Sequence, residues 1–108
     1  MVEYSLQLDS IFRSLSDPIR RDILQFVGND EVTITSLAAR YEVSFAAVSK
    51  HLMVLERAGL IRKRKDGRKQ MVTLVPDAIK DADEYLEQYR VMWQSRHDKL
   101  EALLKEGE

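Results

Sequence analysis

The spacing of the apolar residues changes at Ile61, and this change most limits the folds open to the chain. Before it, apolar residues recur every three or four positions, as on one face of an α-helix. After it, residues 61–65 and 69–75 flank Asp66-Gly67, a dipeptide typical of a tight hairpin turn. The sequence therefore predicts several helices followed by a two-stranded β-hairpin.

Four helices are predicted before the hairpin. The apolar spacing places the first over about residues 4–15, and Asp17, followed by a proline, begins the second. Thr35 is the expected N-cap of a short third helix and Ser44 that of a fourth, because side-chain oxygens at these positions accept the first free N–H groups. Gly59 ends the fourth helix, since glycine tolerates the left-handed conformation found after many helix ends.

A long helix is predicted after the hairpin. Its apolar positions step by three and four, with Arg96 in the one slot that breaks the series. This heptad-like seam predicts a helix of about 27 residues and about 40 Å. The expected fold is one mainly α domain over residues 1–108 with a two-stranded β-wing, in the order α-α-α-α-β-β-α. The seam positions are Ile79, Ala82, Leu86, Tyr89, Trp93, Leu100 and Leu103.

The formal net charge of −1 hides a strongly uneven distribution. Residues 1–49 carry −3, residues 50–70 carry +6, and residues 71–108 carry −4. A basic block between two acidic arms is a candidate contact surface for a polyanion. The alternative is a solvated basic hairpin.

Two short helices joined by a tight turn and followed by a basic hairpin form the pattern of a winged helix-turn-helix. Residues 35–58 would be the helix-turn-helix and residues 61–75 the wing. The second helix fits the major groove of double-stranded DNA while the preceding helix braces it. Phe45 would touch a thymine methyl or, alternatively, pack beneath the turn, and Arg68 is best placed to enter a minor groove. The predicted DNA-binding residues are Ser44, Phe45, Ala46, Ser49, Lys50, Arg62, Arg64, Lys65, Arg68 and Lys69.

Four stretches of the chain resemble the ArsR/SmtB family of bacterial and archaeal repressors. They are FRSLSDPIRRDIL at 12–24, VSKHL at 48–52, LERAGLI at 55–61 and GR at 67–68, in an intact order and spacing. The resemblance implies a homodimer that binds an inverted-repeat operator and blocks transcription. It makes Arg20 and Arg21 usual at the start of the second helix, where their expected partner is an acidic residue of the last helix or a DNA phosphate.

The resemblance also implies that the first and last helices, residues 1–15 and 77–105, build the dimer interface. The seam of the last helix independently indicates a helix that needs a partner, although it could pack against the first helix of its own chain. The predicted interface residues are Leu8, Ile11, Phe12, Ile79, Ala82, Leu86, Tyr89, Trp93, Leu100 and Leu103.

No metal or other cofactor is expected. The chain has no cysteine, which excludes disulfides and zinc–thiolate sites. The metal site that some relatives carry on the last helix would fall on Glu84, Leu86, His97 and Leu100, and two of these are not ligands.

Two weaker ligand sites are left open on the last helix. His97 with Asp98 or Glu101 could hold a metal weakly, as any exposed pair of this kind can. Tyr85, Tyr89 and Trp93 are expected in the dimer interface, or alternatively around a pocket for an unidentified apolar or aromatic inducer.

Other classes of function fit the sequence poorly. Two histidines, no cysteine, no glycine-rich phosphate loop and no Ser/His/Asp arrangement argue against an enzyme. A winged-helix module for protein interaction is the alternative, but Ser49 and Lys50 beside a basic wing favour DNA. The apolar runs are too short to span a membrane and no signal peptide is visible, so a cytoplasmic protein is expected.

Overall fold

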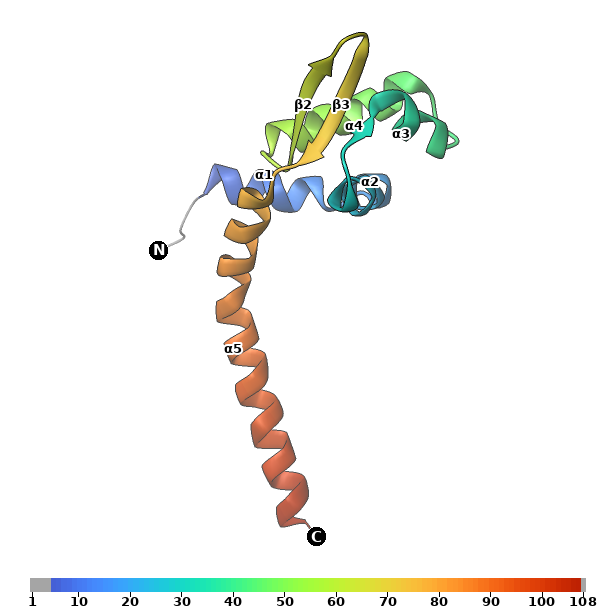
Figure 1. Cartoon of the computed structure of the whole chain (residues 1–108). Coiled ribbons are helices and arrows are strands. Elements are labelled where there is room, and N and C mark those ends of the chain that lie inside the picture. The colour runs from blue at the N-terminus through green and yellow to red at the C-terminus, as the bar shows by residue number, and fades with distance from the viewer. Residues whose placement is uncertain (1–4, 108) are drawn as a thin grey trace.

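The computed structural model describes residues 5–107 and confirms the expected mainly α fold with a β-wing (Figure 1). Residues 1–4, which belong to the expected first helix, lie outside the described residues. One short strand, β1, was not predicted. The elements are α1 (Leu6–Ser14), α2 (Pro18–Asn29), β1 (Val32–Thr33), α3 (Ile34–Arg40), α4 (Phe45–Arg57), β2 (Ile61–Asp66), β3 (Lys69–Leu74) and α5 (Pro76–Glu106).

Side-chain caps begin α1, α2, α3 and α4, and two of the three predicted caps are confirmed. Asp17 accepts from the backbone N–H of Ile19, and Ser44 accepts from that of Ala47 at 3.1 Å. The prediction for Thr35 was wrong, because Thr33 caps α3 instead and accepts from the N–H of Ser36. Thr33 ends a strand, so its extended backbone already has the conformation that an N-cap needs.

The three strands form one antiparallel sheet in the order β1-β3-β2. Asp66 pairs with Lys69, which makes Gly67 and Arg68 the two central residues of the turn. Gly67 has a φ of 63° and Arg68 does not have a positive φ, the pattern of a type II′ hairpin. The turn therefore lies one residue later than the predicted Asp66-Gly67. We call β2, β3 and this turn the wing.

The core lies where α1, α2, α3, α4 and the start of α5 meet the base of the wing. Val48 and Leu52 of α4 are fully buried, as predicted from their spacing. Gly59 follows α4 with a φ of 78°, which confirms the predicted left-handed end of that helix. Two residues predicted at a dimer interface, Ile11 and Ala82, are 0% and 8% exposed in the single chain and belong to this core.

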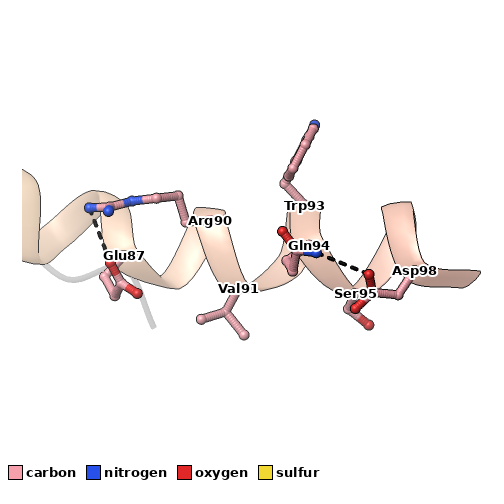
Figure 2. A pocket seen from close by; sticks show the side chains of 7 residues that line it. All are labelled: Glu87, Arg90, Val91, Trp93, Gln94, Ser95 and Asp98. Carbon is pink, nitrogen blue, oxygen red and sulfur yellow. Dashed lines mark hydrogen bonds and ion pairs between the residues drawn. The ribbon is translucent and has the colours of Figure 1, made fainter.

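Helix α5 leaves the core and extends away from the other elements, on the side opposite the wing (Figure 1). The described chain measures 66 × 35 × 22 Å with a radius of gyration of 18.9 Å, whereas a compact chain of this length has about 13 Å. Figure 2 shows Trp93 and Val91 projecting to opposite sides of the bare helix. Trp93 is 64% exposed, so no other element of the described chain covers the seam there. No helix among the described residues is long and apolar enough to cross a membrane.

Candidate nucleic-acid interface

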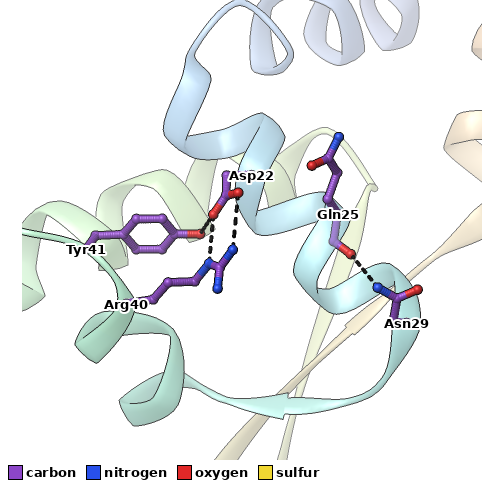
Figure 3. A network of polar contacts seen from close by, with 5 residues as sticks. All are labelled: Asp22, Gln25, Asn29, Arg40 and Tyr41. Carbon is purple, nitrogen blue, oxygen red and sulfur yellow. Dashed lines mark hydrogen bonds and ion pairs between the residues drawn. The ribbon is translucent and has the colours of Figure 1, made fainter.

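Helix α3, the first helix of the helix-turn-helix, is joined to α2 by a polar network (Figure 3). The Asp22 carboxylate accepts from the Tyr41 hydroxyl at 2.6 Å and from Arg40 Nε at 2.8 Å. The Arg40 guanidinium also lies over the Phe26 ring, 4.7 Å from its centroid. These contacts set the position of α3, and with it the turn that leads into α4.

The network shifts the pKa values of its members in opposite directions. The Arg40 guanidinium and then the Tyr41 hydroxyl hold the pKa of Asp22 below its usual value, because both bind the ionised carboxylate. Burial, and then the hydrogen bond to Asp22, raises the pKa of Tyr41 to about 12. The network is therefore built for an ionised Asp22 and a protonated Tyr41.

Helix α4 is attached to the junction between α1 and α2 through Arg20. The Arg20 guanidinium donates from Nε to the Ser14 carbonyl at 2.7 Å and from Nη2 to the Arg13 carbonyl at 3.1 Å. Its Nη1 lies 3.3 Å from Nδ1 of His51 on α4. These three contacts explain the position of the Arg20 guanidinium without either predicted partner, which was an acidic residue of α5 or a DNA phosphate.

Arg21 makes a similar contact and donates to the Leu15 carbonyl at 2.8 Å. The last carbonyls of a helix have no intrahelical partner and carry partial negative charge. Two arginines at the start of α2 are therefore stabilised by the end of α1, which explains why cations occur at a helix N-terminus here. The sequence alone did not predict that the carbonyl end of α1 would lie beside these two arginines.

The outer face of α4 has the character expected of a DNA-reading helix. Ser44, Ala46 and Lys50 are exposed, and Ser49 is half-buried. Phe45 is 58% exposed, so it does not pack beneath the turn as the alternative reading required. This face is small, polar and basic beside a single aromatic ring.

The wing carries its cations in two different states. Arg62, Lys65, Arg68 and Lys69 are exposed, and no ion pair holds any of them within residues 5–107. Arg64 instead binds both carboxylate oxygens of Glu31, with Nε 2.9 Å from Oε2. This contact raises the pKa of Arg64 and ties the wing to the segment before β1.

Three aromatic residues of α1 and α5, Phe12, Tyr85 and Tyr89, contact one another, whereas Trp93 lines a separate cavity of about 630 Å³ along α5. The rings of Phe12 and Tyr85 are 5.8 Å apart, and the Tyr85 and Tyr89 hydroxyls are 3.1 Å apart. A cavity beside Phe12 and Tyr85 measures about 100 Å³. Ligand pockets usually measure about 300–1,000 Å³, so this cavity has no room for an aromatic inducer within one chain.

One group of potential metal ligands occurs in the described part of α5. Donor atoms of His97, Asp98 and Glu101 lie within 4.8 Å of one another, and all three side chains are exposed. The His97 ring stacks on Trp93 at 5.2 Å between centroids. Nothing else in this exposed group points to a bound ion, so we assign it no metal.

Comparison with known proteins identifies the family. A profile described as a helix-turn-helix domain matches residues 15–64. The chain is 34% identical over 80 residues to the uncharacterised HTH-type transcriptional regulator YuzN of Bacillus subtilis, covering 68% of this chain and 87% of that protein. It is 27% identical over 75 residues to the transcriptional repressor SdpR of the same organism, covering 69% and 83% of the two chains.

Solved structures agree with this likeness. The crystal structure of an ArsR family transcriptional regulator superposes with a TM-score of 0.78 at 29% identity, covering 88% of this chain and 98% of that one. The match extends beyond the helix-turn-helix to nearly the whole chain. The chain thus belongs to the ArsR/SmtB family of winged helix-turn-helix proteins, and it is a DNA-binding transcriptional regulator and not an enzyme.

Proposed function

We propose that the chain acts as a homodimeric repressor that binds an inverted-repeat operator, with α4 in the major groove and the wing along the backbone and minor groove. The observation that carries the proposal is the exposed basic surface made by Lys50 and the four wing cations without an ion pair. Cations of this kind neutralise phosphates and release counterions. Its likeness to a protein named as a transcriptional repressor supports repression.

The proposed DNA contacts divide by type. Lys50 and Ser49 face base edges in this proposal, because Lys50 lies on the side of α4 opposite the buried Val48 and Leu52, and the half-buried Ser49 lies at the edge of that outer side. The wing cations bind the backbone and set the register without reading sequence. Arg64 is a positioning residue in this scheme, since its guanidinium is already held by Glu31. The remaining proposed contacts are Ser44, Phe45, Ala46, Arg62, Lys65, Arg68 and Lys69.

The exposed seam of α5 supports the homodimer. Leu86 and Trp93 are 43% and 64% exposed on a helix that leaves the core. An isolated helix gains little stability of its own in water, and covering such side chains contributes about 25 cal/mol per Å² of apolar surface. A second copy presents the same seam. The proposed interface positions outside the single-chain core are Leu8, Phe12, Ile79, Leu86, Tyr89, Trp93, Leu100 and Leu103.

The two-fold axis of such a dimer predicts the operator. Two α4 helices would enter successive major grooves about 34 Å apart, so the half-sites should be inverted and spaced by about one helical turn. A protein bound there would cover promoter DNA and prevent its use by the transcription machinery.

A titration by fluorescence anisotropy tests the proposal. The probe is the palindromic fragment upstream of the chain's own gene, measured from about 50 to 200 mM salt against a scrambled fragment of the same composition. We expect tighter binding to the palindrome and a steep fall in affinity with salt. Equal affinity for the scrambled fragment, or binding with no salt dependence, would contradict it.

A further inference from the structure

A groove separates the tip of the wing from the start of α4. Its volume is about 440 Å³, larger than the cavity between α1 and α5. The wing contributes one wall, Phe45 the other, and β1 with the start of α3 the floor. The lining residues are Thr33, Ile34, Thr35, Phe45, Arg68, Lys69 and Gln70.

The lining of this groove combines two kinds of chemistry. Arg68 and Lys69 are exposed cations, and neither has an ion pair in the described part of the chain. Opposite them stands the Phe45 ring, 58% exposed at the first position of α4. An occupant that suits both walls has an anionic group joined to a small ring that can turn C–H groups toward Phe45. The phosphate and deoxyribose of one nucleotide fit this description.

The position of the groove agrees with its chemistry. In double-stranded DNA the sugar–phosphate backbone is the boundary between the major and the minor groove. If α4 lies in the major groove and the wing tip reaches the adjacent minor groove, one backbone strand must pass between them. The space between Phe45 and the wing tip is where that strand would cross.

We infer that this groove receives the sugar–phosphate backbone of one nucleotide in each operator half-site, with its phosphate on Arg68 and Lys69 and its deoxyribose against Phe45. The inference rests on the proposed function. It gives Phe45 a role different from contact with a thymine methyl. A deoxyribose is present at every position, so Phe45 would anchor the strand whatever the base.

Chemical changes in the DNA test the phosphate contact. The probe is a duplex selected by the wild-type protein from a random pool and then resynthesised with one neutral methylphosphonate at a time. We expect one position in each half-site where the change weakens wild-type binding about tenfold but weakens Lys69→Gln clearly less, because only Arg68 still holds the phosphate there. Such non-additivity identifies groups in contact. Lys99→Gln, on exposed α5, is the control and should keep the full tenfold loss.

A second arm tests the sugar contact. We expect Phe45→Ala to weaken binding about tenfold and Phe45→Leu less, while Val91→Ala leaves the affinity unchanged. Replacing each thymine of the duplex by uracil removes the methyl group and should not reproduce the Phe45→Ala loss. Circular dichroism checks the fold of each variant.

Four results would overturn the inference. The first is that uracil at one position weakens wild-type binding as much as Phe45→Ala does, with no further loss when Phe45→Ala binds the uracil duplex. That result would show that Phe45 contacts a thymine methyl and not a deoxyribose. If no phosphate couples to Lys69, or Phe45→Ala binds as wild type does, the groove is not a backbone site although DNA binding stands. If the pool yields no bound duplex, the proposed function itself fails and the inference falls with it.

Discussion

Nη1 of Arg20 lies 3.3 Å from Nδ1 of His51, which joins the start of α2 to the middle of α4. A guanidinium only donates, so Nδ1 of His51 is the acceptor in this contact. The same guanidinium binds the carbonyls of Arg13 and Ser14 at the end of α1. One side chain therefore connects α1, α2 and α4, and α4 carries the proposed DNA-reading face.

Replacing Arg20 should destabilise the fold more than replacing its neighbour. Arg20→Gln loses contacts to three groups and leaves helix-end carbonyls without a charged donor, so we expect the free energy of unfolding to fall by about 2 kcal/mol. Arg21→Gln loses one exposed contact, to the Leu15 carbonyl, and should change it by less than about 1 kcal/mol. Urea unfolding followed by circular dichroism measures both. Equal losses would show that the Arg20 contacts do not support the helix junction.

The α2–α3 network should make stability depend on pH at the acid side. The pKa of Asp22 is lowered in the folded chain, so its contribution is fully present above the unfolded value of 3.8 and is lost as pH falls through the folded value. Asp22→Asn should flatten the acid limb of a plot of unfolding free energy against pH. Asp9→Asn on α1 is the control, and an equal flattening there would contradict this assignment.

The same network predicts a late tyrosine titration. Burial and then Asp22 raise the pKa of Tyr41 from 10.0 to about 12, so the stabilisation is present below pH 10 and is lost as pH rises toward 12. In an ultraviolet titration we expect Tyr41 to ionise near pH 12. Tyr41→Phe should remove that step, whereas Tyr89→Phe should not. A late step that persists in Tyr41→Phe would assign it to another tyrosine.

Local signals in the sequence were enough to predict much of the fold. The caps at Asp17 and Ser44 involve bonds within three residues, and Gly59 satisfies a backbone requirement of its own helix end. Strand β1 was missed because it has two residues, too few for a period, and exists through pairing of Val32 with Val72. The Thr35 error follows from the missed strand, since the end of β1 decides where α3 begins.

The candidate site was predicted in composition but not in its internal connections. The basic block and the turn of the wing could be predicted, because each is formed by residues that are close together in the sequence. The pairing of Arg64 with Glu31 spans 33 positions, and that of Arg20 with His51 spans 31. A single sequence gives no sign of such distant pairs. Arg64 was therefore predicted to bind DNA together with the other wing cations, and the predicted partner of Arg20 was an acidic residue of the last helix or a DNA phosphate.

Two wing arginines should differ in how they affect the salt dependence of DNA binding. Arg68→Gln removes one phosphate contact from each subunit of the proposed dimer, so it should lower the slope of log affinity against log salt by about 1.8, twice the value for one contact. Arg64→Gln should change the slope less, because Glu31 already neutralises that guanidinium. Anisotropy titrations across several salt concentrations give both slopes. A larger slope change for Arg64 would mean that DNA displaces Glu31 and binds Arg64 directly.

Substitutions on opposite sides of α5 should separate the dimer interface from the solvent face. Leu86 lies on the seam and is 43% exposed, whereas Val91 is 61% exposed and projects away from the side that carries Trp93 (Figure 2). A two-fold axis introduces Leu86→Glu twice into one interface, and burying two unpaired carboxylates should weaken the dimer by at least about 100-fold. Sedimentation velocity should then find a monomer for Leu86→Glu and a dimer for Val91→Glu. If Leu86→Glu stays dimeric while Val91→Glu does not, the partner binds the opposite face of α5.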